Sequence, residues 1–289
     1  MKYKTQRIIL IIAFLFVPLV LLIAFTFLPT VSVFWYSLHK WNGLSPKEFI
    51  GLDNYVQIFS DPKYFLPLVN SLYYLVGAVL QMVLGLFFAT LLTYNLRFKN
   101  TFKGILFFPY LINGVAVGLM FTFFFRGDGL LNTITGLLGY TNDGYLMTPF
   151  WNNVLLSLVS VWRYMGFNLV MFLGAIQSVS SDVLEAAEID GANKFTIFLR
   201  IIFPMIKNII LLNLILAVKG AVSVFEVPYI MTGGSFDTST FVIETINMGM
   251  KNPRRQVGLA SALSTVLFFI ILIVTVVQKL IFREKESNY

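Results

Sequence analysis

The chain has no cysteine, a single histidine and few charged residues. Charged types make up 12% of its 289 residues, about half of their share in a typical soluble domain. Without cysteine there can be no disulfide and no thiolate metal site, and His39 alone cannot form a multi-histidine metal cluster. The sequence also lacks a G-x-x-x-x-G-K-[ST] loop, so we expect no ATP site and no cofactor in this chain.

Hydrophobic types make up 57% of the chain, and phenylalanine alone contributes 30 residues. The apolar residues form long blocks, which is typical of a protein that crosses a membrane. The formal net charge of +7 raises the alternative of nucleic-acid binding. The basic residues, however, are scattered between the apolar blocks and form no basic face, so membrane topology explains them better than nucleic acid does.

Six apolar blocks predict six transmembrane helices in one all-α, polytopic transmembrane domain, residues 1–289. The predicted spans are residues 8–38, 67–96, 104–125, 154–179, 206–228 and 258–282.

The first block has no formal charge and, at about 1.5 Å per residue, is longer than a bilayer core of about 30 Å. We expect it to tilt, to kink at Pro18 or Pro29, or to project beyond the membrane. The alternative is a signal peptide, because Lys2, Lys4 and Arg7 resemble its basic start. The block is too long for that reading and no clear small-residue cleavage site follows, so we predict a retained span.

Basic residues cluster in the short segments that six spans would place on one side of the membrane. These residues are Lys2, Lys4, Arg7, Arg97, Lys99, Lys103, Lys194, Arg200, Lys207, Lys279, Arg283 and Lys285. By the positive-inside rule, that side and both termini are cytoplasmic. Lys251, Arg254 and Arg255 fall outside, against the trend, in a longer loop where the rule is weaker.

The segment between the fourth and fifth spans, residues 181–204, is the most informative. Ser181 or Asp182 can cap a short helix, and Glu185 completes a capping box if Asp182 is the cap. Gly191 can end this helix in a left-handed conformation. We expect a second short helix over residues 193–203, with Pro204 opening the next span. On spacing alone, a plain connecting loop remains an equal alternative.

This segment resembles the EAA motif of ABC-importer permeases, in which Glu-Ala-Ala, three residues and Gly precede a downstream Ile-x-Leu-Pro. The matching residues are Glu185, Ala186, Ala187, Asp190, Gly191, Ala192, Phe198, Ile201 and Pro204. Phe203 stands where the family usually has leucine, which keeps an apolar residue there.

The resemblance implies that the loop is a coupling helix that docks on a separate cytoplasmic ATPase subunit. It further implies two such ATPase subunits, which carry ATP and magnesium, a second homologous permease, and a soluble protein that delivers substrate from outside. The chain itself would then be a transport subunit and no enzyme. The residues that would contact the ATPase are Glu185, Ala186, Ala187, Asp190 and Gly191.

Nearly the whole chain resembles the carbohydrate-uptake permeases related to the maltose transporter, in a form like a short version of the larger maltose permease. The supporting segments are residues 49–55, Trp162 with Gly166, residues 231–234 and residues 259–262. An oligosaccharide is therefore the expected substrate. The alternative is a permease of the same superfamily for an amino acid, a polyamine or phosphate. A membrane-embedded enzyme is disfavoured because the spans hold no cluster of histidine, cysteine or paired carboxylates.

Several polar residues fall within the predicted fourth and fifth spans, where ionisable groups are costly and normally face a protein or water-filled interior. We predict that they line the path of a hydroxyl-rich solute: Trp162, Arg163, Lys219, Ser223 and Glu226. The spacing of Lys219, Ser223 and Glu226 would place them on one stripe of a continuous helix. Two alternatives stay open: Glu226 pairs structurally with Arg163, or Lys219 reaches toward an interface.

Small residues at spacing four in the second span predict a helix-packing seam, formed by Gly77, Gln81, Gly85 and Ala89. Asn113, Gly114 and Gly118 in the third span suit either packing or substrate contact, and we favour packing. His39 is assigned no role.

Overall fold

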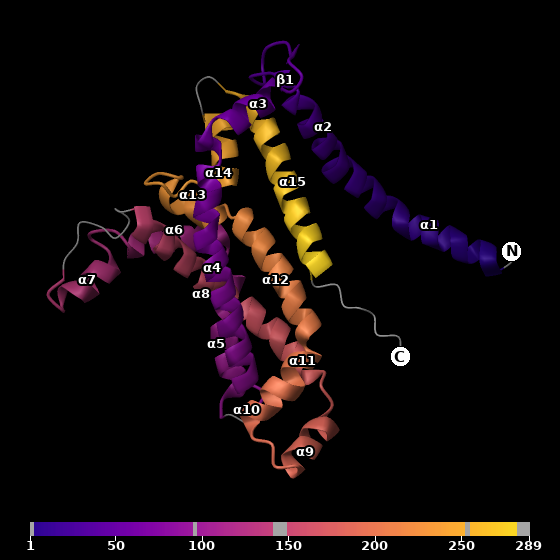
Figure 1. Cartoon of the computed structure of the whole chain (residues 1–289), viewed down its shortest axis with the longest axis vertical. Helices are drawn as coiled ribbons and strands as arrows, with labels where there is room; N and C mark the ends of the chain where they lie inside the picture. Colours follow the sequence, from indigo (N-terminus) through magenta and orange to yellow (C-terminus); the bar gives the residue numbers. More distant parts are fainter. Residues whose placement is uncertain (1–2, 95–96, 141–148, 252–254, 282–289) are drawn as a thin grey trace. The chain divides into compact units, whose positions relative to one another are not determined.

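The computed structural model describes residues 3–94, 97–140, 149–251 and 255–281 (Figure 1). Its contacts divide the chain into two compact units. Unit 1 comprises Met1–Tyr64 and Thr245–Ile270, and unit 2 comprises Phe65–Glu244 and Ile271–Tyr289. Four of the basic residues used for the orientation, Lys2, Arg254, Arg283 and Lys285, lie outside the described residues.

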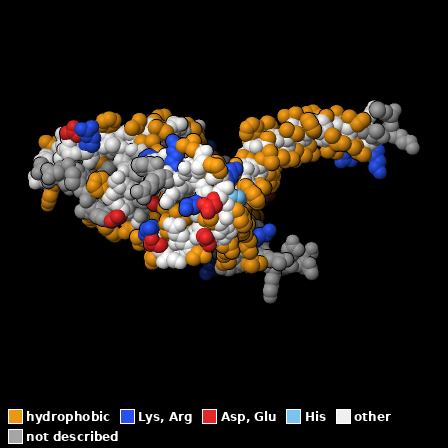
Figure 2. Space-filling view, turned by 90° about the horizontal axis from the view of Figure 1, so that it is seen from above, with side chains coloured by type: hydrophobic (Ala, Val, Ile, Leu, Met, Phe, Trp, Pro, Cys, Tyr) orange, Lys and Arg blue, Asp and Glu red, His pale blue; other side chains and the backbone are white. Residues whose placement is uncertain are grey.

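The first span belongs to unit 1 and consists of α1 (Tyr3–Leu22), a π-helical turn η1 (Ile23–Phe27) and α2 (Leu28–Ser37). Pro18 lies inside α1, whereas the π turn directly precedes Pro29 in the first turn of α2. Proline has no N–H to donate, which explains a local change of the helical hydrogen bonding at that point. Exposed hydrophobic side chains cover α1 (Figure 2), as expected for a helix surrounded by lipid.

A small hairpin follows the first span and adds two short strands to the expected all-helical fold. Strands β1 (His39–Lys40) and β2 (Glu48–Phe49) pair antiparallel, and α3 (Asp53–Ser60) and a 3-10 turn η2 (Pro62–Tyr64) come next. The Asn54 side chain donates to the carbonyls of Ser37 and His39, at 2.8 and 3.1 Å. This amide therefore satisfies the carbonyl of Ser37 at the end of α2 and also binds the first residue of β1.

The last span, α15 (Val257–Ile281), starts against this hairpin. The N–H of Gly258 donates to the carbonyl of Trp41 at 3.0 Å, and a Cβ at Gly258 would collide with the carbonyl of His39. A side chain at position 258 would thus separate the last span from the hairpin. His39 itself is only 5% exposed, with Nδ1 2.8 Å from the carbonyl of Trp35.

Two long helices, α4 (Leu66–Leu91) and α8 (Pro149–Gln177), form the centre of unit 2 and cross closely. A Cβ at Gly77 would collide with the Ser157 hydroxyl, and one at Gly85 would lie 2.8 Å from the Cβ of Asn168. The predicted packing seam on the second span is therefore confirmed at its glycines and at the fully buried Ala89.

The remaining helical segments of the fold, in chain order, are α5 (Lys99–Leu111), α6 (Gly114–Phe124), α7 (Leu130–Gly136), α9 (Ser181–Ile189), α10 (Lys194–Ile197), η3 (Phe198–Ile202), α11 (Phe203–Met205), α12 (Lys207–Val222), α13 (Glu226–Thr232), α14 (Phe241–Ile246) and η4 (Asn247–Lys251). Five helices among the described residues are long and apolar enough to cross a membrane, and the bent pair α5–α6 makes a sixth if it is one span.

The predicted third and fifth spans are not single straight helices. Helices α5 and α6 meet at an angle of 95°, and the Asn113 side chain between them caps α6 by accepting from the N–H of Val115. Helix α12 ends at Val222 and α13 begins at Glu226, with φ −145° at the intervening Phe225. An asparagine cap before glycine is a helix-start signal, which the apolar composition of the block concealed.

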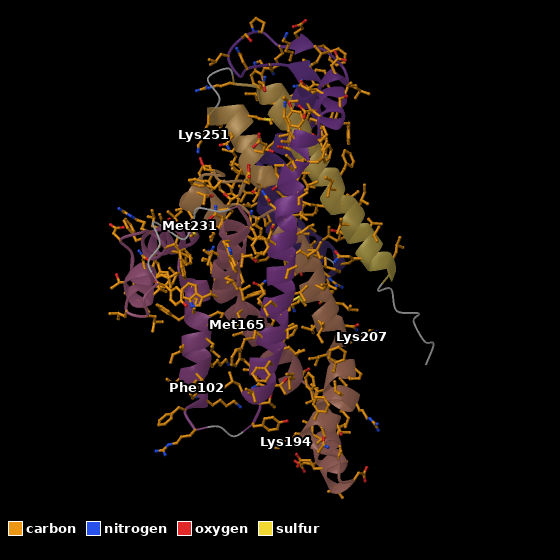
Figure 3. All side chains as sticks on the ribbon, turned by 60° about the vertical axis from the view of Figure 1, so that its left-hand side comes forward. Phe102, Met165, Lys194, Lys207, Met231 and Lys251 are labelled. Carbon is orange, nitrogen blue, oxygen red and sulfur yellow. The ribbon has the colours of Figure 1, made fainter. Side chains whose placement is uncertain are left out.

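The described residues of unit 2 form two hydrophobic cores that both involve α4 and α8. We call the core that includes α13 the outer core. It consists of Tyr74, Val117, Phe125, Leu156, Val159, Ala221, Val227 and Met231. We call the core that includes α10 the inner core. It consists of Met82, Ala89, Leu92, Leu169, Phe172, Leu173, Ile176, Val179, Ile197, Ile202 and Ile206. The two cores lie at different levels of unit 2. In Figure 3, Met231 of the first core lies above Met165 on α8, and Lys194, at the start of α10, lies below Met165.

The close crossing of α4 and α8 requires a residue without a side chain at position 85. We expect Gly85→Ala to destabilise the folded protein by about 1–3 kcal/mol, because its Cβ has no room and the helices must move apart. Thermal unfolding of the protein in detergent measures this. Gly104→Ala is the matched control, since no atom lies within 4 Å of a Cβ there. Equal stability of the two variants would contradict the close crossing.

Candidate functional site

A cavity of about 470 Å³ lies between the two cores of unit 2. The cavity-lining residues of α4, α8 and α12–α13 lie, along each helix, between residues of the outer core and residues of the inner core. On α8, for example, the lining residues follow Val159 of the outer core and precede Leu169 of the inner core. The polar members of the lining are Tyr74, Gln81, Ser160, Arg163, Tyr164, Asn168, Asn213, Ser223 and Glu226. Unit 2 therefore has a polar layer at the level where the third and fifth spans break.

The strongest interaction in this layer is an ion pair between α8 and the first residue of α13. Arg163 Nη1 donates to Glu226 Oε2 at 2.8 Å. The Arg163 side chain is only 11% exposed, whereas the Glu226 side chain is 54% exposed. Arg163 Nε is buried without a hydrogen-bond partner among the described residues. The alternative that these two residues pair is confirmed, and both also line the cavity.

The start of α6 lies directly on this ion pair. A Cβ at Gly114 would collide with the Glu226 carboxylate and lie 2.7 Å from Arg163 Nη1. The carboxylate thus sits at the first turn of α6, where the helix dipole favours negative charge. Gly114, predicted to serve packing, makes room for a charged group.

The structure places the five predicted pathway residues in different surroundings. Arg163, Ser223 and Glu226 line the cavity together. Trp162 instead meets Phe121 edge-on at 5.2 Å between ring centroids, and Lys219 is exposed on the last turn of α12. The prediction of one continuous stripe through Lys219 and Glu226 is wrong, because the helix ends between them.

Sequence reasoning missed two buried amides in the cavity. Asn168 on α8 is 4% exposed and Asn213 on α12 is 3% exposed, and both lie in apolar blocks. An asparagine at membrane depth is itself a signal, because an unsatisfied amide is costly in an apolar medium.

The second candidate region is the loop between α8 and α12, at the end of unit 2 opposite α13 (Figure 1). Its first helix, α9, is capped by Ser180, whose hydroxyl accepts from the N–H of Asp182 at 3.3 Å. The predicted caps, Ser181 and Asp182, lie within the helix instead. Glu185 therefore does not occupy a capping-box position, and its carboxylate is exposed.

The end of α9 has the left-handed conformation that was predicted for Gly191. Gly191 has φ +80°. The N–H of Ala192 donates to the carbonyl of Ala187, and that of Gly191 donates to the carbonyl of Glu188, both at 3.0 Å. These two bonds form a Schellman motif, which ends the helix sharply. The small side chains of Ala187 and Ala192 both pack against the inner core.

The second half of the loop ties it to the spans. Asn193 caps α10 by accepting from the N–H of Thr196 at 2.8 Å. Ile197 and Ile202 are buried in the inner core. The predicted second helix is present as α10, a π turn and α11, but Pro204 lies in α11, and the span α12 begins after a further turn at Lys207.

The outer face of this loop exposes both charged and apolar side chains. Glu185, Ala186 and Asp190 are exposed, as are Ile189 at 86% and Phe195 at 71%. Ile189 and Phe195 were not singled out from the sequence, because both fit an ordinary amphipathic pattern. Large apolar side chains on a polar loop are typical of a docking surface.

Comparison with known proteins defines the class. Residues 81–286 match the model of the binding-protein-dependent transport system inner membrane component family, and the chain belongs to this family. It is accordingly a multi-spanning inner-membrane transport subunit rather than an enzyme.

Two relatives and one solved structure place the chain more closely. It is 32% identical to the "Probable ABC transporter permease protein YurN" of Bacillus subtilis, over 87% of this chain and 89% of the relative. It is 30% identical to the trehalose/maltose transport system permease protein MalF of Thermococcus litoralis, over 86% and 84%. The fold matches a chain of a bacterial ABC transporter that imports alginate, with a TM-score of 0.85, 20% identity and 98% coverage of both chains.

The Schellman motif gives a local prediction. We expect Gly191→Ala to lower the free energy of local opening of this loop by about 1 kcal/mol, because an L-residue is strained at positive φ. The loop should then open more often, and trypsin should cleave faster after Lys194 in membranes. Gly220→Ala is the control, since it adds a methyl to a helix with free space. An unchanged cleavage rate would contradict a strained position.

Proposed function

We propose that this chain forms half of an alternating-access pathway in an ATP-driven importer for an oligosaccharide. In this proposal it works with a second homologous permease, two cytoplasmic ATPase subunits and a soluble sugar-binding protein outside. The observation that carries the proposal is the polar cavity between two apolar cores. A polar layer of this kind at membrane depth is costly unless a polar solute or water uses it.

The lining of the cavity suits a sugar. Hydroxyl and amide groups supply both donors and acceptors, which a hydroxyl-rich solute needs on every side. Tyr164 and Phe167 add aromatic faces on the same wall, against which a sugar ring can pack. The only full charges in the lining, Arg163 and Glu226, neutralise each other. A neutral solute fits this balance better than phosphate or a polyamine, and the trehalose/maltose relative supports the same choice.

The loop from α9 to α11 supplies the contact with the ATPase in this proposal. The loop is held by the Schellman motif and the Asn193 cap, and its buried isoleucines belong to the inner core. Such a loop can transmit a displacement of the ATPase subunit to the spans. Ile189 and Phe195 would fill an apolar cleft on the ATPase subunit. Glu185 would meet a basic residue at its rim, in a charge-assisted contact. The small side chain of Ala186 would allow close approach.

The proposal places this loop and both termini in the cytoplasm. Lys194 lies at the loop end of unit 2, and Phe102 lies toward that end, close to Lys99 and Lys103 in α5 (Figure 3). Lys207 is the first residue of α12, directly after the loop. These basic residues follow the positive-inside rule if that end is cytoplasmic.

The docking surface is tested by copurification. We expect Ile189→Ser to reduce the amount of ATPase subunit that copurifies with the full chain by roughly tenfold or more, as for loss of a central apolar anchor. Phe102→Ser is the control, because Phe102 is also an exposed apolar residue but lies outside the loop. Equal recovery of the ATPase with both variants would argue against docking through Ile189.

The orientation and the partner are tested together by crosslinking. The chain has no native cysteine, so Glu185→Cys gives a single reactive thiol. In the assembled complex we expect it to crosslink to the ATPase subunit with a short bifunctional reagent. Labelling by a membrane-impermeant reagent from outside intact cells would contradict a cytoplasmic loop.

The substrate is tested on the purified complex with its co-expressed partners. ATPase rates are measured with the binding protein and a panel of oligosaccharides, amino acids, polyamines and phosphate. We expect stimulation by an oligosaccharide. Stimulation by a solute from another class would retain the importer and replace the substrate, whereas no copurifying ATPase would contradict the proposal as a whole.

A further inference from the structure

Helices α6 and α13 begin at the same place and form a close pair within unit 2. Their first residues, Gly114 and Glu226, are in direct contact. One turn further along α6, a Cβ at Gly118 would lie 2.7 Å from the side chain of Ile230 on α13. Because glycine permits this approach at two successive turns, the two short helices can behave as one rigid element.

The loop that follows α13, at the end away from the ion pair, is held by neutral amides. Asn70 on α4 donates to the carbonyls of Asp237 and Ser239, at 2.7 and 2.8 Å. On α8, Asn152 donates to the carbonyl of Phe236 at 3.5 Å, and Asn153 to that of Asp237 at 3.1 Å. The loop after α13 is thus bound to both central helices through its backbone. We call these bonds the asparagine clamp.

The inner end of the pair is held differently, by the Arg163–Glu226 ion pair. One partner is nearly buried and the other is more than half exposed toward the cavity. If the pair separates, Glu226 can be solvated in place, and Arg163 remains beside the hydroxyls and amides of the lining. Separation therefore costs less than it would for a pair buried on both sides. The neutral amide bonds of the clamp gain little from cavity water because they lie outside the cavity lining.

We propose that the Arg163–Glu226 ion pair is a releasable latch. It holds the inner ends of α6 and α13 on α8 in this conformation and lets them pivot about the asparagine clamp in the other state. Arg163 and Glu226 are positioning residues in this role, and Gly114 is required because any side chain there would displace the carboxylate from the arginine. The second state rests on the proposed transport function, but the latch itself is a property of this chain.

Cysteine accessibility tests the latch without a substrate. Ser223 lines the cavity beside the pair, so Ser223→Cys in the cysteine-free chain reports on access to it. The full chain is expressed with its partner subunits in membrane vesicles and labelled with a small methanethiosulfonate reagent. We expect Glu226→Gln to raise the labelling rate by at least about fivefold, the lower end of typical coupling between two states.

Two further variants separate the latch from general damage. Gly114→Ala keeps both charges and should also raise the rate, because it breaks the contact by steric displacement. Asp128→Asn is the matched control: this carboxylate pairs with Arg126 at 3.0 Å, outside both the latch and the clamp, and its loss should leave the rate unchanged. The exchange Arg163→Glu with Glu226→Arg should return the rate toward that of Ser223→Cys alone.

The outcomes are distinct. Unchanged labelling in both Glu226→Gln and Gly114→Ala would overturn the latch, and so would an equal rise in the Asp128→Asn control. Should Glu226→Gln fail to assemble, Gly114→Ala and the charge exchange decide the question by the same rates. Because no solute enters the assay, a failure of the sugar proposal would leave these rates, and the latch, intact.

Discussion

A guanidinium within a membrane-spanning bundle needs polar neighbours, and three segments of unit 2 bring Glu226 to Arg163. Helix α12 stops at Val222, so that the next helix can start with Glu226 facing Arg163. Helix α6 starts at a glycine, so that the carboxylate fits against its first turn. The bends of the third and fifth spans therefore bring the ends of two short helices to one charge–charge contact.

The two cores give this contact its setting. The outer core holds α6 and α13 against α4 and α8, and the inner core joins the same two long helices to the loop of α9 and α10. Movement at the loop would consequently reach the polar layer through close-packed side chains of α4 and α8, which belong to both cores. In an importer of this family the docking surface and the cavity would be coupled in this way, because well-packed cores transmit displacement rather than absorb it.

The sequence predicted the features that local chemistry determines. Long apolar blocks marked the spans, Gly77, Gly85 and Ala89 on one helical face marked the α4–α8 seam, and Gly191 marked the left-handed helix end. The bend at Asn113, the break at Phe225 and the β1–β2 hairpin depend on contacts between distant segments, and apolar composition is the same in a straight helix and a broken one. The cap at Ser180 was missed by one residue, since three polar residues in a row, from 180 to 182, offer equivalent oxygens.

If the proposed transport function holds, the polar layer of unit 2 lies on the path of the solute. The most direct measurement is protection of Ser223→Cys from alkylation in the complete transporter, during ATP turnover, by the sugar that stimulates its ATPase. We expect this sugar to slow the alkylation of Ser223→Cys. The alkylation rate of Ser178→Cys, an exposed position directly after α8, should stay the same. Equal alkylation of Ser223→Cys with and without the sugar would place the path elsewhere.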